Sequence, residues 1–331
     1  MSERRVLVLG GTSFIGRRIV ELLHERGDRV LVAHRGHTEP DGLPSVGHVH
    51  VPRAELASVR ADIESFAPTA VVDTVAMSAA GVDAVLPVLP EVPIVVLSSA
   101  DAYQAYDVFR FGAAALATEE IGVPLAESSP VRSKRYPYRD ENNPDSDYEK
   151  LDVEPRYLDR GAAVLRLGFV YGERDPQRRE EFVLRRVRAG RTRIPFGCGS
   201  LLLSRLYVDD AASATLAALD TPAAAGEIFN IVESASVSIA AWARQILAAT
   251  DSTADLVRVP GAALPGDLEL TDLTTQHLLI SSAKAQRMLG WTPSEPALTV
   301  PKSVRWHLAN PPTGEDPGFD ADDVALRSAQ S

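Results

Sequence analysis

The N-terminal third of the chain alternates short apolar runs with segments of helical periodicity. The first run, at 6–9, ends at a glycine pair, and the next apolar residues share one helical face: Ile15, Ile19, Leu22 and Leu23. Further strands are predicted at 30–33, 49–51, 70–76 and 94–98, with a helix at 54–66. Continuously apolar strands alternating with helices are typical of a parallel sheet covered on both faces. We therefore predict a doubly wound α/β fold.

Residues 104–147 interrupt this alternation with a stretch that is rich in Pro, Ser, Arg and Tyr. The stretch is too long for a simple connector, so we interpret it as a functional loop or lid. The alternation then resumes with a helix predicted at 146–160 and a strand at 162–167. We predict a Rossmann-type domain at 1–170, a smaller C-terminal α/β substrate lobe at 171–310 with some segments returning to the sheet, and a solvated acidic tail at 311–331.

Composition excludes several classes of protein. Of the 331 residues, 45% are hydrophobic and 24% charged, which is ordinary for a globular chain. The chain contains no apolar run long enough for a transmembrane helix, and it begins without the pattern of a secretory signal. A single cysteine, Cys198, fits a reducing cytoplasm, and the net charge of −11 opposes a general nucleic-acid surface. We expect a cytoplasmic protein that binds neither nucleic acid nor membranes.

A glycine-rich segment lies between the first strand and the first helix. Glycines at this place allow a tight turn and the close approach of a pyrophosphate to the helix N-terminus, whose free N–H groups favour anions. The flanking strand and helix are the context that such a loop requires. The predicted dinucleotide-binding residues in this segment are Gly10, Thr12, Ser13, Phe14, Ile15 and Gly16.

The end of the second strand bears on the choice of dinucleotide. Sites that prefer NAD carry an acid there for the ribose hydroxyls, whereas this strand is followed by Arg35. An arginine at this place pairs with a 2′-phosphate, so NADP is the preferred cofactor and NAD the alternative.

Four nearby histidines lack the spacing and supporting acids of a metal site, so no metal is predicted: His34, His37, His48 and His50.

Beyond these local signals, the chain resembles the extended short-chain dehydrogenase/reductase superfamily, of the NAD-dependent epimerase/dehydratase type. The likeness runs from about residue 4 to 310. Its pieces are GGTSFIG at 10–16, LSSADAY at 97–103, YEKLDVE at 148–154, VLRLGFVYGERD at 164–175, YVDDAASA at 207–214, EIFNI at 227–231 and KAQRMLGWTP at 284–293.

The resemblance implies roles for particular residues. The family's catalytic serine lies four residues before a tyrosine, which matches Ser99 and Tyr103. The family lysine matches Lys150, which would hold the nicotinamide ribose and lower the pKa of a neighbouring hydroxyl. Ala76 and Leu167 are further expected contacts of the cofactor.

The family's proton-donating tyrosine, expected four residues before the lysine, is replaced by Ser146. On the predicted helix Ser146 would point into the site, although it is also a plain helix N-terminal serine. Tyr148 would face away on the same helix. Other tyrosines remain open as substitutes, namely Tyr103, Tyr136 and Tyr138. Alternatively Ser99, a water or the substrate supplies the proton, or the protein binds the cofactor without turning it over.

Two further departures concern the substrate. Nucleotide-sugar members of the family carry an asparagine and an arginine where this chain has Phe169 and Leu203. Losing an amide and a cation removes anion-binding chemistry and adds an apolar wall. With Tyr136 and Tyr138 as candidate clamps, we expect a non-nucleotide, partly apolar small molecule.

These features together favour an NADP-dependent ketoreductase with an atypical active site. An epimerase or dehydratase that reduces a bound cofactor transiently is the first alternative, and a non-catalytic dinucleotide-sensing protein is the second. A homodimer is expected by analogy with the family alone.

Overall fold

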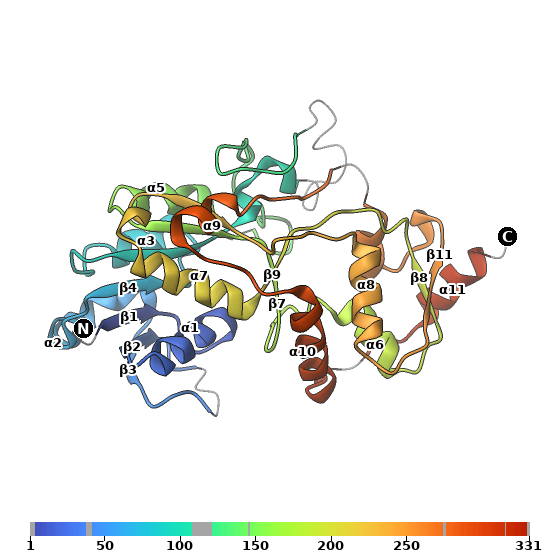
Figure 1. Cartoon of the computed structure of the whole chain (residues 1–331), viewed down its shortest axis with the longest axis horizontal. Helices are drawn as coiled ribbons and strands as arrows, with labels where there is room; N and C mark the ends of the chain where they lie inside the picture. Colours follow the sequence, from blue (N-terminus) through green and yellow to red (C-terminus); the bar gives the residue numbers. More distant parts are fainter. Residues whose placement is uncertain are drawn as a thin grey trace.

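A seven-stranded parallel sheet forms the centre of the molecule (Figure 1). The computed structural model describes residues 4–37, 42–107, 121–144, 146–273, 276–314 and 316–329. The strand order is β10-β6-β5-β4-β1-β2-β3. In chain order the strands are β1 (Arg5–Leu9), β2 (Arg29–His34), β3 (Gly47–His50), β4 (Ala70–Asp73), β5 (Ile94–Ser99), β6 (Ala163–Leu167) and β10 (Ile228–Ile231). The predicted Rossmann-type α/β fold is confirmed.

Helices cover both faces of this sheet because its strands are apolar on both. Along β1, Val6 and Val8 pack into one buried cluster, and Leu7 and Leu9 into another, as expected when side chains alternate between faces. The first cluster includes residues of α1 (Phe14–Glu25) and α7 (Val208–Asp220). The second is covered by α2 (Arg60–Phe66), α3 (Ala79–Val85) and α5 (Lys150–Leu158). The predicted helix at 54–66 begins as a 3₁₀ helix, Arg53–Val59.

The strand order places a crevice at the carboxyl ends of the strands. The chain leaves β1 toward β2 on one side and later returns to β4 on the other, which is the topological switch point where ligands bind in such sheets. The loops after β1 and β4 meet there, since Thr74 Oγ1 donates to the Leu9 carbonyl at 3.0 Å. The glycine-rich segment therefore lies at the crevice.

The helix after the long loop begins four residues later than predicted. Glu149 is its N-cap residue, accepting from the Leu151 N–H at 3.0 Å, and its fully buried carboxylate pairs with Arg132. This buried ion pair holds the helix start at Lys150. Ser146 and Tyr148 consequently lie in the non-helical segment before α5, and the prediction that they occupy opposite faces of a helix is wrong.

The C-terminal lobe lies at the end of the molecule opposite β3 (Figure 1). It holds two small parallel pairs, β7 (Phe169–Tyr171) with β9 (Arg205–Tyr207), and β8 (Arg193–Phe196) with β11 (Asp255–Arg258). Its helices are α6 (Glu181–Arg188), α8 (Ile239–Ala248) and α10 (Pro296–Ala309), while α9 (Ala283–Leu289) packs beside β10. Trp242 of α8 is buried among the rings of Phe169, Tyr171 and Phe182.

The prediction of a solvated acidic tail is wrong for one part of the described residues after 311, because most of them are exposed but three are buried. They include a further helix, α11 (Asp320–Ser328), which buries Asp322, Ala325 and Leu326. Asp322 accepts two hydrogen bonds of 2.7 Å from Arg186, whose side chain is fully buried. Of the five acids in this tail, Glu315 lies outside the described residues. Within the described ranges no helix is both long and apolar enough to cross a lipid bilayer.

Candidate functional site

The loop after β1 has a backbone that only glycine fits at two places. Gly10 has φ of +76°, and a Cβ there would lie 2.6 Å from the Val75 side chain. A Cβ on Gly16 would overlap the carbonyl oxygen of Gly10. Phe14, the first residue of α1, has φ of +41°, a strained value for a bulky side chain. Strain of this kind gathers at ligand-binding sites, and here it lies at a helix N-terminus.

Two cavities meet at this loop and form one groove across the carboxyl ends of the strands. The smaller, about 500 Å³, is lined by Gly10, Thr12 and Arg35 among others. The larger, about 830 Å³, is lined by Phe14, Ile15, Gly16 and Leu167 among others. Ser13, Thr74, Val75 and Met77 line both cavities.

The shape and donors of this groove fit a dinucleotide. Its middle lies at the N-terminus of α1, where main-chain N–H groups have no partner within the helix and favour a pyrophosphate. Ser13 is the N-cap residue of α1 and makes no side-chain cap hydrogen bond, so its hydroxyl is not committed to the helix. Arg35 is exposed at the wall of the smaller cavity, with its guanidinium available to an anion. Ala76 is the exception among the predicted contacts, because it is fully buried and lines neither cavity.

Four polar side chains gather at the wall of the larger cavity: Ser99, Asp101, Tyr148 and Lys150. Ser99 ends β5, and its Oγ accepts from the Asp101 N–H at 3.2 Å. The Tyr148 hydroxyl donates to Asp101 Oδ2 at 2.8 Å, and the Ser99 hydroxyl acts to lower the pKa of Tyr148. Tyr138 donates to the same Asp101 oxygen at 3.1 Å, and its ring meets that of Tyr148 edge to face.

Lys150 lies behind Tyr148 at the start of α5. Its Nζ donates to the carbonyls of Ala76 at 2.6 Å and Leu97 at 3.1 Å, and its third contact is Met77 Sδ at 3.6 Å. Burial lowers the pKa of Lys150 to about 8, although Asp101, Asp73 and Glu154 act to raise it. The ammonium lies 5.5 Å from the centre of the Tyr148 ring. A thioether is a weak acceptor, so a ligand hydroxyl can replace it.

The electrostatics of the site keep Tyr148 protonated. Burial raises the pKa of the Tyr148 phenol well above its usual value, and the negative charge of Asp101 raises it further. The Ser99 hydroxyl acts in the opposite direction and lowers this pKa. Tyr148 is therefore a phenol held next to a cavity, beside a cation and a carboxylate, and can donate a proton.

Tyr148 lines the larger cavity, whereas the helix predicted from residue 146 would turn its side chain away from the site. Because α5 starts at Lys150, Tyr148 lies in a non-helical segment, and its hydroxyl reaches Asp101. The signal for this arrangement is the buried pair of Glu149 with Arg132, which are 17 residues apart in the chain. Glutamate is not a favoured N-cap residue, so no local pattern marks the helix start.

Four of the residues predicted as catalytic or substrate-binding line neither cavity. Tyr103 is fully buried, donates to Asn230 Oδ1 at 2.7 Å and lies with its ring against the Arg166 guanidinium. Its side chain is therefore part of the core. Leu203 is 1% exposed and packs with Tyr103 in the same apolar cluster. Neither residue lines the described cavities, so the geometry gives no support to the catalytic role predicted for Tyr103 or the substrate role predicted for Leu203.

The other two belong to the segment before α5. The Ser146 carbonyl accepts a hydrogen bond from Arg139 at 3.1 Å, and Ser146 does not line the larger cavity, so its predicted catalytic role gains no support. Tyr136 stacks its ring on Arg139 at 4.1 Å, also off the cavity wall. Tyr138 and Phe169, in contrast, line the larger cavity as predicted substrate residues should. Part of the loop, 108–120 and 145, lies outside the described residues.

Comparisons with known proteins agree with this fold. The chain superposes on UDP-glucose 4-epimerase from Thermotoga maritima, solved with UDP-glucose, with a TM-score of 0.67 at 19% identity, covering 92% of this chain and 99% of that one. The dTDP-glucose 4,6-dehydratase from Bacillus anthracis, solved in complex with NAD, gives a TM-score of 0.68 at 16% identity, covering 93% and 97%.

A relative is also found by sequence. The chain is 25% identical over 312 residues to the chloroplast stem-loop binding protein of 41 kDa b of Arabidopsis thaliana, covering 88% of this chain and 76% of that protein. Residues 6–232 match the model of the NAD dependent epimerase/dehydratase family. Because that match spans more than half of its residues, the chain belongs to the NAD-dependent epimerase/dehydratase family.

Proposed function

We propose that this protein is an NADP-dependent ketoreductase in which Tyr148 delivers the proton to the substrate oxygen. The observation that carries the proposal is the Tyr148 phenol, hydrogen-bonded to Asp101, which lines the larger cavity of the dinucleotide groove together with Ser99. A non-catalytic dinucleotide sensor would not need a polar cluster at that place.

Cofactor binding rests on the groove already described. The segment from Gly10 to Gly16 holds the pyrophosphate, Arg35 pairs with the 2′-phosphate, and Lys150 exchanges its thioether contact for a ribose hydroxyl. Bound NADPH supplies a hydride to the carbonyl carbon. NAD is the alternative cofactor, because Arg35 is the single side chain that we propose for the 2′-phosphate, and that side chain is exposed.

Proton delivery follows from the protonation state of Tyr148. Burial and the charge of Asp101 raise the pKa of Tyr148, so the phenol is protonated at neutral pH, as a proton donor must be, but they also make it a weaker acid. As the carbonyl gains a hydride at carbon, its oxygen takes the proton of Tyr148, and the resulting phenolate is stabilised by the Lys150 ammonium. A proton from solvent then restores the phenol. Ser99 orients the same oxygen by a hydrogen bond.

The substrate class follows from the remaining wall of the cavity. Phe169, Pro137 and Leu270 supply apolar surface, as expected for a partly apolar molecule. Asp101 Oδ1 is buried and has no hydrogen-bond partner among the described residues. A buried acceptor without a partner is costly, and a donor on the substrate satisfies it. We therefore propose a carbonyl compound that carries a hydroxyl or amine group close to the carbonyl.

An epimerase or dehydratase is the second candidate. The pair of Asp101 and Tyr148 offers a carboxylate and a phenol at one point of the cavity, which proton removal and return on a sugar-like carbon would use. Such an enzyme returns the hydride to its product, so it retains its nucleotide and shows no net oxidation or reduction.

Kinetic assays distinguish the two candidates. Purified protein is mixed with NADPH and a panel of hydroxylated ketones, and NADPH consumption is followed by its absorbance. Net consumption that is lost in Tyr148→Phe and retained in Tyr136→Phe supports the ketoreductase. Dinucleotide that co-purifies with the chain, together with isomerised or dehydrated product and no net consumption, supports the second candidate instead.

A further inference from the structure

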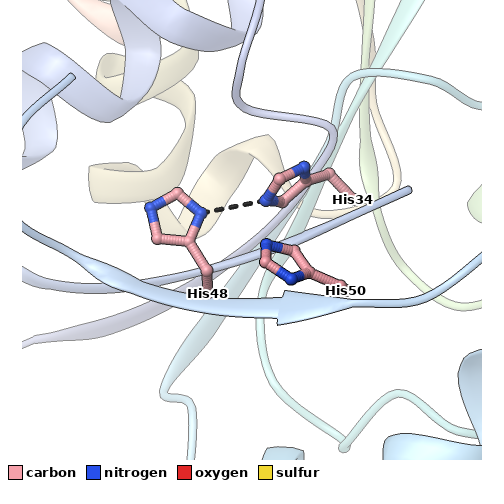
Figure 2. Close-up of side chains that lie close together, drawn as sticks. All are labelled: His34, His48 and His50. Carbon is pink, nitrogen blue, oxygen red and sulfur yellow. Dashed lines mark hydrogen bonds between the residues drawn. The ribbon is translucent and has the colours of Figure 1, made fainter. Parts of the chain in front are cut away.

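Three histidine side chains gather at the edge of the sheet, outside the polar cluster of the larger cavity (Figure 2). His48 and His50 are two residues apart on β3, so both point to the same face of the strand. His34 ends β2, and the parallel register places it directly opposite His50. The strand pairing thus joins an alternating histidine pair to a third histidine from the neighbouring strand.

The ring nitrogens of the cluster lie close enough for a shared ligand. His34 Nε2 and His48 Nδ1 are 3.0 Å apart, and the His34 and His50 ring centres are 4.7 Å apart. One nitrogen from each ring lies within 4.8 Å of one from each of the others. Two nitrogens bound to the same tetrahedral zinc ion, each at about 2.0 Å from it, are separated by about 3.3 Å. The observed separations, from 3.0 Å for the His34 and His48 nitrogens up to at most 4.8 Å, bracket that value.

The donor set identifies the kind of ion. Imidazole nitrogens suit zinc, copper, nickel and cobalt, whereas magnesium and calcium require oxygen ligands. The cluster consists of imidazoles without a carboxylate among the described residues. His34 is buried, His48 half-buried and His50 exposed, so an ion can enter from solvent and be held from the protein side.

We propose that His34, His48 and His50 bind one divalent transition-metal ion of the zinc class, through one ring nitrogen each. With these three ligands from the described residues, a tetrahedral ion keeps a fourth coordination position. This site departs from the sequence-based expectation of no metal. The spacing of the histidines along the chain does not predict this site, because His34 comes next to His50 only through the pairing of β2 with β3.

Binding has one local consequence. The Gly36 N–H donates to His34 Nδ1 at 3.2 Å, so the neutral ring carries its proton on Nε2 and donates to His48. An ion on Nε2 moves that proton to Nδ1, and the Gly36 peptide must turn away. Gly36 is exposed, lies beyond the end of β2 and has φ of +78°, so this peptide has room to turn.

Cobalt(II) alone is a suitable probe for the full chain, because Co²⁺ bound by three imidazoles and water absorbs visible light strongly and is displaced by Zn²⁺. We expect one Co²⁺ per chain in wild type. His50→Ala and His48→Ala should each weaken Co²⁺ binding by at least about tenfold. His24→Ala, an exposed histidine on α1, is the matched control and should bind as wild type does.

His34→Gln tests the third ligand while keeping a hydrogen-bonding side chain. If it binds Co²⁺ as tightly as wild type, only a two-histidine surface chelate exists and the proposal is wrong. Absence of saturable binding in wild type, or equal losses in His24→Ala and His50→Ala, would also overturn it. Circular dichroism of each variant shows that the fold is retained, and the titration needs no dinucleotide, so its result is independent of the proposed function.

Discussion

Tyr148 and Asp101 are joined by a hydrogen bond of 2.8 Å across 47 residues of chain, between the segment before α5 and the turn after β5. The bond aligns a phenol with the cavity wall at a place where no regular element holds it. It also couples the two groups electrostatically, because the carboxylate makes loss of the phenolic proton harder.

Replacing Tyr148 tests whether this phenol carries the proton. Tyr148→Phe should lower the rate of carbonyl reduction by about a hundredfold to ten-thousandfold, the usual contribution of a general acid. NADPH affinity, measured by fluorescence titration, should stay within about twofold, because the ring and its packing remain. Tyr136→Phe, on the same loop but off the cavity, is the control. Equal turnover in Tyr148→Phe and wild type would exclude the role.

Lys150 makes stability depend on pH in a defined direction. Its folded pKa of about 8 lies below the usual value for lysine, so the unfolded chain binds more protons between these values. The free energy of unfolding should therefore gain from this residue as pH rises from about 8 to 10. Urea unfolding of wild type and Lys150→Met across this range isolates the contribution. If the free energy of unfolding changes with pH in the same way for wild type and variant, the lowered pKa of Lys150 is contradicted.

Arg35 should decide between the two dinucleotides. Arg35→Ala removes the charge proposed to pair with the 2′-phosphate, so NADPH binding should weaken by roughly tenfold to a hundredfold. NADH binding should hardly change. Arg29→Ala, exposed at the other end of β2, provides the control for loss of a surface arginine. Similar weakening of NADH and NADPH in Arg35→Ala would remove the basis for NADP preference.

The C-terminal helix is expected to contribute strongly to stability. Asp322→Ala leaves the buried guanidinium of Arg186 with Asp267 as its remaining carboxylate partner among the described residues, and should cost about 3 kcal/mol. Asp323→Ala breaks a partly exposed pair with Arg191 and should cost less than about 1 kcal/mol. Denaturant unfolding followed by Trp fluorescence measures both. Equal losses would mean that burial of the Arg186 pair is unimportant.

We expect this chain not to bind nucleic acid, in contrast to what the name of the chloroplast relative describes. Its name describes stem-loop binding, whereas this chain has a net charge of −11, and many of its arginines are paired with carboxylates. We therefore expect no shift of RNA stem-loops in gel electrophoresis at about 0.15 M salt. Salt-dependent binding at low concentrations of the protein would contradict this expectation.

The sequence predicts the sheet and the groove well because both depend on local patterns. Apolar strands of β1 and β2, a glycine turn and an amphipathic helix are each visible within a few residues. The glycines are required by backbone contacts that recur whenever a strand turns into a helix against a pyrophosphate. The residues of this loop consequently lie where the pattern predicts them.

The polar cluster could not be predicted in the same way, because distant contacts create it. The start of α5 depends on a buried pair between Glu149 and Arg132, and Tyr148 enters the cavity only as a result. The four-residue spacing from Ser99 predicts a catalytic role for Tyr103, but its hydroxyl donates to Asn230 of β10 in the core. The burial of Asp322 likewise depends on Arg186, 136 residues earlier.

The Arg186–Asp322 pair also sets the order of events during protein synthesis. Domains generally fold as units while the N-terminal part of a chain emerges first. The guanidinium of Arg186 lacks the carboxylate of Asp322 until the α11 segment has been translated, so the contacts of α6 are completed only then. We therefore expect the C-terminal lobe to mature last on the ribosome, and a nascent chain stalled before Asp322 to be more open to proteases and chaperones there.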